Sequence, residues 1–224
     1  MSVWAHPDDE SFFAAGIMAA AVDGGQKVIC VCATDGERGI AHTTYAPPEK
    51  MAKIRAQELE AAMTVLGVKE CHALGYADGG CAAVPSDDVV AKLKKLIDKY
   101  RPDTILTFGP DGMTGHDDHR AVSKWVGEAA HGTDINVYHA VLAPDLYQKM
   151  LAADQRFNIF FNIDRPPVVE EAKCGLLFRL PDERARQKYR CLCAMPSQTE
   201  AMFSAFGEEA IRDMIGAEAF VKAK

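Results

Sequence analysis

The sequence predicts an α/β fold, specifically a Rossmann-like, doubly wound and mostly parallel sheet flanked by helices. Short apolar segments of strand length alternate with longer stretches of helical periodicity, the pattern typical of a parallel sheet. The 224 residues suffice for one medium-sized domain with its own core, and no linker or internal repeat divides them. We therefore expect a single domain, with the core sheet in residues 1–143 and an irregular α+β extension in residues 144–224.

The first half of the predicted core begins with a short apolar segment. The unbroken apolar run VICVCA at 28–33 predicts a strand buried on both faces. Gly67 indicates the end of a helix, because glycine readily adopts the left-handed conformation found there. The expected elements are, in order, a strand at 3–5, a helix at 11–23, a strand at 28–33, a helix at 50–66 and a weaker strand at 69–73.

The second half of the core continues the alternation. From Ser86, the expected N-cap, apolar side chains recur at helical spacing as far as Tyr100. Arg101-Pro102 ends this helix, since a residue before proline disfavours helical backbone. The remaining core elements are a strand at 104–108 (TILTF), a helix that begins near 116–119 with Val122, Trp125, Val126 and Ala129 on one face, and a strand at 136–142.

Beyond residue 144 the periodicity weakens. Strands are expected around 157–163 and 168–178, and helices near 182–193 and 198–217. These four elements would make up the C-terminal extension.

Composition and charge exclude several classes of partner. The net charge of −7 argues against a protein that binds nucleic acid or an anionic membrane, because such partners require a basic surface. No apolar stretch approaches the ~20 residues of a membrane span, and no signal-peptide pattern is visible, so we expect a cytoplasmic protein. The seven cysteines show no Cys-x-x-Cys spacing, which predicts reduced and mostly buried thiols.

Two clusters of histidines and carboxylates directly follow predicted strands. One is His6-Pro7-Asp8-Asp9-Glu10, after the first strand, and the other is His116-Asp117-Asp118-His119, after the strand at 104–108. In doubly wound sheets, ligands bind beyond the carboxyl ends of the strands where the strand order reverses. If these two strands are neighbours at that point, the clusters face each other across one crevice.

The residue types in the two clusters suit a hydrolytic zinc site. Such a site takes three His or carboxylate ligands and leaves room for water, and His6, Asp9 and His119 supply that set. Asp8 would then be free to accept a proton from the water. Of His116 and His119, one could bind metal while the other, protonated, stabilises an oxyanion or protonates a leaving amine.

Helix capping explains either cluster taken alone. An Asp-Asp pair before a helix commonly caps it and complements its dipole. Two such clusters at the same end of two predicted parallel strands favour the metal site instead.

The two motifs resemble those of the PIG-L/LmbE-like family of zinc-dependent N-acetylglucosaminyl deacetylases. That family reads A-H-P-D-D-E near the N-terminus, as residues 5–10 do here, and H-x-D-H about a hundred residues later, as 116–119 do. The resemblance extends to TDGERG at 34–39, IRAQEL at 54–59, LGV at 66–68 and SQ at 197–198. It therefore spans most of the chain.

The resemblance implies a fold, a reaction and a role for each matching residue. The expected activity is hydrolysis of a linear amide, which removes the acetyl group from an N-acetylglucosamine-type conjugate, with one Zn²⁺ per chain or another divalent ion such as Fe²⁺. The expected partner is a small amino-sugar conjugate rather than nucleic acid or membrane, and assembly into a homo-oligomer stays open. By position, the resemblance implies metal on His6, Asp9 and His119, Asp8 as general base, His116 as stabiliser of the transition state, Asp118 as an orienting carboxylate and Arg38 near the sugar.

This chain also departs from the family pattern. The stretch Phe12-Phe13-Ala14-Ala15-Gly16 is bulkier than the small residues and paired glycines common after the first motif, and Met195-Pro196 stands where a histidine is frequent. Neither departure touches the expected ligands.

Three alternatives remain open on the sequence. One is an amidase that cleaves a larger acyl group from a sugar conjugate. A second is a non-catalytic zinc- or sugar-binding module, against which the extra carboxylate of Asp8 argues. A third is a magnesium-dependent phosphotransfer domain, which two histidines disfavour because magnesium prefers oxygen ligands.

Overall fold

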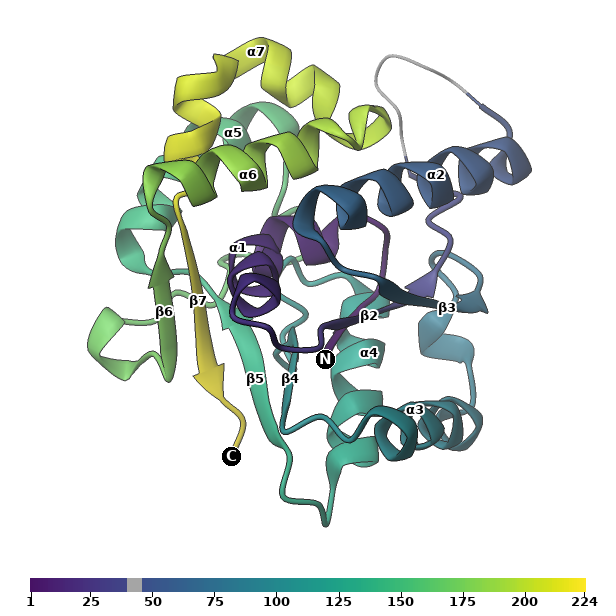
Figure 1. Ribbon diagram of the computed structural model, residues 1–224. Coiled ribbons are helices and arrows are strands. Elements are labelled where there is room, and N and C mark those ends of the chain that lie inside the picture. Colours follow the sequence, from purple (N-terminus) through teal and green to yellow (C-terminus); the bar gives the residue numbers. More distant parts are fainter. Residues whose placement is uncertain (40–45) are drawn as a thin grey trace.

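The computed structural model describes residues 1–39 and 46–224, so residues 40–45 of the predicted loop at 34–48 lie outside the described part. A twisted sheet runs through the molecule with helices on both faces (Figure 1). The elements are β1 (Ser2–Trp4), α1 (Asp9–Asp23), β2 (Ile29–Thr34), α2 (Pro48–Leu66), β3 (Glu70–Tyr76), η1 (Cys81–Ala83), α3 (Ser86–Tyr100), β4 (Thr104–Phe108), α4 (Asp117–Ala130), β5 (Asn136–Val141), α5 (Pro144–Phe157), η2 (Glu171–Lys173), β6 (Leu176–Arg179), α6 (Asp182–Cys193), α7 (Pro196–Met214) and β7 (Ala217–Lys222).

The sheet confirms the predicted doubly wound fold. Its seven strands follow the order β3-β2-β1-β4-β5-β7-β6. The first five are parallel, whereas β7 pairs antiparallel with both β5 and β6. The chain winds from β1 toward β3 and then returns to β4 on the other side of β1. The strand order therefore reverses between β1 and β4, where this type of sheet binds its ligands.

The core lies on both faces of the parallel strands. Every residue of β1 and β2 is buried, as the apolar run at 28–33 predicted. Trp4 packs edge to face against Phe108, with ring centroids 4.9 Å apart, which ties β1 to the end of β4. The predicted apolar face of α4 is buried as well, and it comprises Val122, Trp125, Val126 and Ala129.

Helix ends in the first half follow the predicted signals with one exception. Gly67 ends α2 in the left-handed conformation, with φ of 73°. Arg101 ends α3, also left-handed. Ser86 was expected to cap α3, but it is the first residue of the helix instead. Pro85 takes the N-cap position because its ring fixes φ at −57° and its backbone is extended.

The C-terminal third differs from the expectation in two places. The strand predicted at 157–163 is wrong. The chain there leaves α5, which begins at Pro144 and ends at the left-handed Asn158. Of the strand predicted at 168–178, only β6 forms, together with a single bridge from Val168 to Leu142.

The final strand, β7, was also not predicted, since the last helix was expected to run to residue 217 and no element was expected beyond it. That helix, α7, ends at Met214 and is kinked at Gly207, where φ is 77°. The helix predicted at 182–193 is confirmed as α6.

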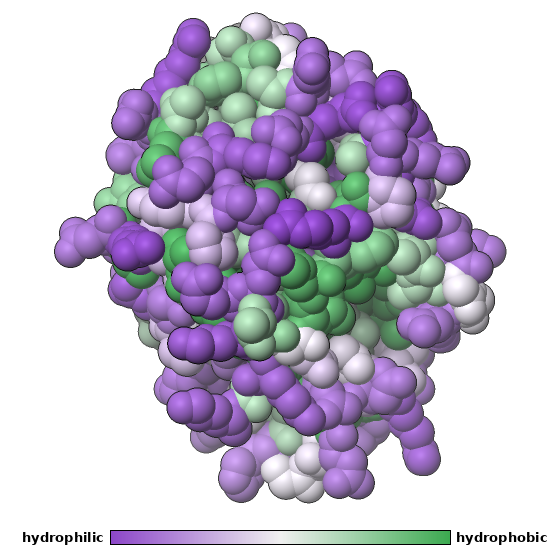
Figure 2. Space-filling model, turned by 90° about the vertical axis from the view of Figure 1, so that its left-hand side faces the viewer, coloured by the Kyte–Doolittle hydropathy of each residue, from purple (hydrophilic) through white to green (hydrophobic). Residues whose placement is uncertain are grey.

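The two edge strands of the sheet, β3 and β6, are less covered than its centre. The apolar residues of β6 are only partly buried, in contrast to those of β1 and β2. Figure 2, turned so that the left-hand side of Figure 1 faces the viewer, shows mostly hydrophilic side chains around a hydrophobic hollow near the centre of that face. The best enclosed part of the sheet is therefore its centre, where β1 and β2 lie.

Two expectations from composition can be compared with the structure. All seven cysteines lie within the described residues and are free thiols, and four of them are buried: Cys30, Cys32, Cys81 and Cys191. Among the described residues, no helix combines the length and apolar character needed to cross a bilayer.

A buried ion pair joins β7 to the helices above it. Lys188 Nζ lies 2.7 Å from Glu218 Oε1, and the two side chains are 1% and 0% exposed. Glu218 also accepts hydrogen bonds from the backbone N–H groups of Gly16 and Ile17, both at 2.8 Å. One carboxylate of β7 thus connects to α6 and α1 together.

We expect Lys188→Met to lower the free energy of unfolding by about 3–5 kcal/mol, because it leaves the Glu218 charge buried without its partner. Urea denaturation followed by circular dichroism measures this change. Lys149→Met is the matched control, since Lys149 pairs with Asp213 at the same 2.7 Å distance while both side chains are exposed, and it should cost less than about 1 kcal/mol. Equal losses of unfolding free energy in the two variants would show that the buried Lys188–Glu218 pair matters no more than an exposed pair.

Candidate metal centre

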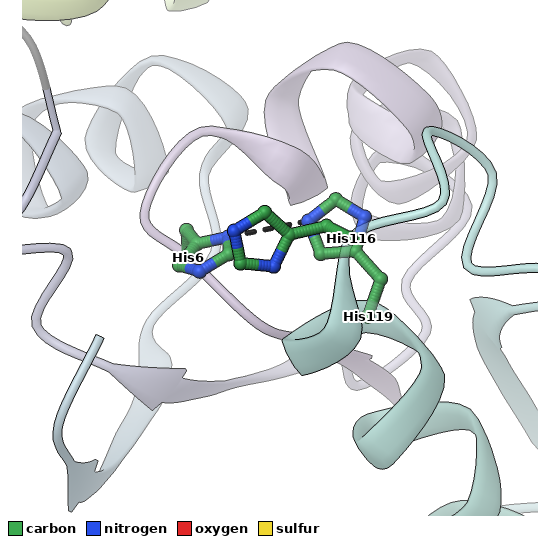
Figure 3. A group of neighbouring side chains, drawn as sticks. All are labelled: His6, His116 and His119. Carbon is green, nitrogen blue, oxygen red and sulfur yellow. Dashed lines mark hydrogen bonds between the residues drawn. The ribbon is translucent and has the colours of Figure 1, made fainter. Parts of the chain in front are cut away.

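The two predicted clusters meet at the carboxyl ends of β1 and β4. His6 lies in the turn between β1 and α1, and His116 and His119 lie at the start of α4. Figure 3 shows the three imidazole rings side by side, although they come from turns more than a hundred residues apart. The neighbouring, parallel arrangement of β1 and β4 produces this convergence.

A nitrogen of His6 faces a nitrogen of His119 at the centre of the cluster. His6 Nδ1 and His119 Nε2 are 3.2 Å apart. His119 Nδ1 donates to the carbonyl oxygen of Gly112 at 2.8 Å, which leaves the lone pair on Nε2. Asp9 completes the group, with Oδ2 3.6 Å from His6 Nδ1 and Oδ1 3.5 Å from His119 Nε2.

These three donors suit one divalent cation. Metal–ligand bonds of about 2.0–2.2 Å place neighbouring ligands of a tetrahedral ion roughly 3.3 to 3.6 Å apart. The two nitrogens are 3.2 Å apart, and each lies 3.5 or 3.6 Å from a different oxygen of the Asp9 carboxylate. Two imidazole nitrogens and one carboxylate also suit zinc better than magnesium, which prefers oxygen ligands.

Two carboxylates hold the other side of the His6 ring. His6 Nε2 lies 3.1 Å from Asp78 Oδ1 and 3.2 Å from Asp118 Oδ2, so its N–H donates to this pair. Asp118 is fully buried and also accepts the backbone N–H groups of Gly79 and Cys81 at 2.7 and 3.0 Å. Such contacts fix the tautomer and the orientation of a ligating histidine.

Sequence reasoning missed Asp78. This residue follows β3, whose carboxyl end lies at the same edge of the sheet as those of β1 and β4. An acidic residue followed by Gly79-Gly80 at that edge was a usable signal.

Charges within the cluster shift the pKa values of its members. Burial alone would lower the pKa of His6, but hydrogen bonds to Asp118, Asp78 and Asp9 raise it well above its ordinary value. Burial lowers the pKa of His119 to about 4. Burial opposes the charge of Asp9 as well, yet His119 and His6 lower its pKa to about 2. The cluster therefore carries a positive charge beside Asp9, which a bound cation would replace.

His116 lies beside the three donors and is less buried than His6 or His119. It is the N-cap of α4, and its Nδ1 accepts the backbone N–H of Asp118 at 3.1 Å. Since Nδ1 is an acceptor, the ring carries its proton on Nε2. A nitrogen of His116 lies within 4.8 Å of the ligand atoms of His6 and His119.

Asp8 points to a different partner from its neighbour Asp9. It occupies the N-cap position of α1 with φ of 134°, yet its side chain caps nothing. Its Oδ2 lies 3.1 Å from an Arg55 nitrogen. Burial raises the pKa of Asp8 to about 7, although Arg55 opposes the rise. Helix capping therefore does not account for Asp8.

Arg55 is a second residue that sequence reasoning did not single out. It is 3% exposed and donates to the carbonyl oxygens of Gly36 and Pro7, in addition to its contact with Asp8. Arg55 lies in the matching stretch IRAQEL at 54–59, but the sequence indicated no role for it, because its partners come from two distant turns.

Glu10 and Arg38 take positions outside the cluster. Glu10 is buried, accepts the Ser11 hydroxyl at 2.6 Å, and has its pKa raised by burial to about 8. Arg38 is exposed, and its backbone N–H donates to Asp78 at 3.0 Å. Its side chain passes so close to Gly79 that a β-carbon there would lie 2.7 Å from a guanidinium nitrogen. Arg38 thus lies next to Asp78, at the rim of the site.

The chain is similar over part of its length to proteins named as sugar deacetylases. A family model described as "PIG-L: GlcNAc-PI de-N-acetylase" matches residues 1–130. A protein of Catenulispora acidiphila named 1D-myo-inositol 2-acetamido-2-deoxy-alpha-D-glucopyranoside deacetylase 2 is 37% identical over 139 residues, which cover 52% of this chain and 46% of that protein. A protein of Bacillus anthracis named "Probable N-acetyl-alpha-D-glucosaminyl L-malate deacetylase 2" is 33% identical over 129 residues, which cover 57% of each chain. The matched region thus spans about half the length of these relatives.

A solved structure shares the whole fold. The N,N'-diacetylchitobiose deacetylase of Pyrococcus horikoshii superposes with a TM-score of 0.69 at 21% identity, and the match covers 99% of this chain and 82% of the other. The agreement includes the C-terminal third, which the family model does not reach.

We expect Asp118→Asn to weaken the binding of a divalent cation 10- to 100-fold, because it removes a carboxylate that orients His6. Titration with zinc against a chromophoric chelator measures this affinity. Asp117→Asn changes the adjacent residue, whose side chain is 77% exposed, and should leave affinity unaltered. If both variants bind zinc like the parent, Asp118 has no orienting role.

Proposed function

Because the chain belongs to the PIG-L family, as its motifs predicted, we propose that it is a metal-dependent hydrolase that removes the acetyl group from an N-acetylglucosamine-type conjugate. The observation that carries this proposal is the convergence of His6 Nδ1, His119 Nε2 and the Asp9 carboxylate within 3.2 to 3.6 Å of one another. Both relatives act, by name, on an N-acetylated glucosamine joined to a different second group. The sugar is thus the better supported part of the substrate.

The metal in this proposal is one zinc ion held by His6, Asp9 and His119. Imidazole nitrogens also suit Fe²⁺, so iron is the alternative ion. When bound, such an ion polarises the amide carbonyl and makes water a stronger acid. The remaining steps belong to side chains around these three residues.

Asp8 is the proposed general base. Its carboxylate stands beside Asp9 without belonging to the His6–His119 pair, and Arg55 fixes its position from the opposite side. A carboxyl group with a pKa of about 7 exchanges protons efficiently at neutral pH. Asp8 accepts a proton from the attacking water and then returns it to the departing amine.

His116 is the proposed donor to the oxyanion. The sequence suggested an imidazolium in this place, but the hydrogen bond from the Asp118 amide to Nδ1 favours a neutral ring with its proton on Nε2. That N–H can donate to the carbonyl oxygen as negative charge develops there. Loss of one such donor typically costs on the order of 3 kcal/mol in the barrier.

Arg38 and Asp118 complete the proposal. Arg38, at the rim beside Asp78, is placed to contact the sugar or its substituent. Asp118 orients His6 rather than touching substrate. A non-catalytic binding module would need neither Asp8 nor the buried Arg55 behind it, so the hydrolase is the better interpretation.

Acetate release from a panel of N-acetylglucosamine conjugates tests the function. We expect the purified protein to release acetate from at least one conjugate, to lose this activity after treatment with a chelator, and to regain it with about one equivalent of zinc per chain. Release that persists in metal-free protein would refute a metal-dependent reaction.

We expect Asp8→Asn to reduce kcat roughly 10²- to 10⁴-fold, the usual contribution of a general base, while the zinc content stays near that of the parent. Asp35→Asn is the control, because Asp35 is an exposed carboxylate in the loop that follows β2. Metal analysis accompanies the kinetics. If Asp8→Asn turns over like the parent, another group is the base.

A further inference from the structure

A cavity of about 250 Å³ adjoins the cluster of His6, Asp9 and His119. Asp9 lines it directly, and so does Thr114, whose hydroxyl lies 3.3 Å from His119 Nδ1. The cavity extends from there between α5, α7 and the ends of β5 and β7. It therefore reaches from the expected reaction centre into the C-terminal third.

The walls of this cavity are apolar beyond its site end. Phe12 and Phe13, the bulky pair noted in the sequence, form part of the wall from α1, and Met150 of α5 and Met202 of α7 form other parts. Among the described residues that line the cavity, the polar ones are Asp9, Thr114, Gln198, Lys188 and Glu218. The last two neutralise each other, at 2.7 Å. Away from the reaction centre, the cavity thus offers a ligand no free charge.

An aliphatic chain matches this lining better than a sugar does. Sugar hydroxyls placed here would lose their hydrogen bonds to water without replacement. An apolar cavity of about 150 Å³ holds benzene, so a cavity of this size holds roughly ten carbon atoms. The flexible methionine side chains in the wall can adapt to a chain of variable length.

Polar and apolar groups lie on opposite sides of β1 and β4 along the strand order of the sheet. Asp78 and Arg38 follow β3 and β2, on one side of β1 and β4. The cavity lies toward β5 and β7, on the other side. In an amide, the nitrogen and the acyl chain are bonded to the carbonyl carbon on different sides. A substrate whose sugar contacts the polar loops therefore directs its acyl group into the cavity.

We propose that the same site also hydrolyses amides whose acyl group is longer than acetyl, a medium-length aliphatic chain of roughly eight to ten carbons held in this cavity. The proposal rests on the proposed function, since it assigns the acyl part of the same amide substrate. The bond that breaks is the C–N bond of the amide, and water supplies the hydroxyl of the carboxylic acid and the proton of the amine.

A series of N-acyl glucosamines tests the proposal with the zinc-loaded protein. The acyl groups are acetyl, butanoyl, hexanoyl, octanoyl, decanoyl and hexadecanoyl, and the free amine is measured. We expect kcat/KM to rise about three- to fourfold per added methylene up to eight or ten carbons and to fall for hexadecanoyl. A steady fall from acetyl onward would overturn the proposal and leave the proposed deacetylase intact. If no member of the series reacts, the proposed function fails with it.

Variants at alanines inside and outside the cavity test whether the acyl chain of the substrate binds there. Ala153 is 1% exposed and lines the cavity from α5, whereas Ala152 is its exposed neighbour on the same helix. We expect Ala153→Phe to reduce the ratio of octanoyl to acetyl turnover at least 30-fold and Ala152→Phe to leave both activities unchanged. Ala219→Leu fills the cavity from β7 and should reduce the same ratio. An unchanged ratio in both cavity variants would contradict the proposal.

Binding gives a readout that does not depend on turnover. In the Asp8→Asn background, calorimetry should show N-octanoyl glucosamine binding at least 30-fold more tightly than N-acetyl glucosamine, and adding Ala153→Phe should abolish the difference. Equal affinity for the two compounds before the cavity is filled would overturn the proposal.

Discussion

The contact between His6 Nδ1 and His119 Nε2 is the constraint on which the site depends. Two imidazole nitrogens at 3.2 Å cannot both present lone pairs to each other without repulsion, so a proton or a cation must lie between them. The outer nitrogens are fixed as donors, His6 to Asp78 and Asp118 and His119 to the Gly112 carbonyl, so neither ring can relieve the contact by changing tautomer. With Asp9 at the same point, the protein maintains an arrangement that favours binding a divalent ion.

The topology explains why residues so distant in sequence meet there. The reversal of strand order between β1 and β4 leaves both turns open at one edge of the sheet, where parallel strands deliver their carboxyl ends. The same reversal places different kinds of residue on the two sides of the site. Polar loops after β2 and β3 lie on one side, and the apolar cavity beside β5 and β7 lies on the other. The antiparallel β7 makes this division possible, because it brings the C-terminal helices over the end of β5. The buried Lys188–Glu218 pair then ties β7 to α6 and α1.

Local patterns predicted the parallel half of the fold and fell short in the last third. The apolar run TILTF at 104–108 predicted a buried strand, and the apolar spacing around Trp125 predicted the buried face of α4. Gly67 predicted a helix end from its backbone preference alone. None of these predictions required knowledge of tertiary contacts. In contrast, β7 is a short segment with a buried glutamate, whose partner Lys188 comes from a different element. The ligand candidates were visible as motifs. Asp78 was not, and Arg55 appeared only as part of IRAQEL without a role, since each acts through partners that only folding assembles.

Asp8 and Asp9 illustrate how one short turn gives two adjacent carboxylates different partners. The φ of 134° at Asp8 is unfavourable for a residue with a side chain, and such conformations cost on the order of 1–3 kcal/mol. Arg55 stabilises the turn by binding both the Pro7 carbonyl and the Asp8 carboxylate, and Glu10 accepts the Asp8 amide. As a result Asp9 faces the histidine pair while its neighbour faces a guanidinium. In an ordinary helical start the N-cap carboxylate would bond to the first backbone amides, so the strained backbone is what turns Asp8 away from them and keeps its carboxylate apart from that of Asp9.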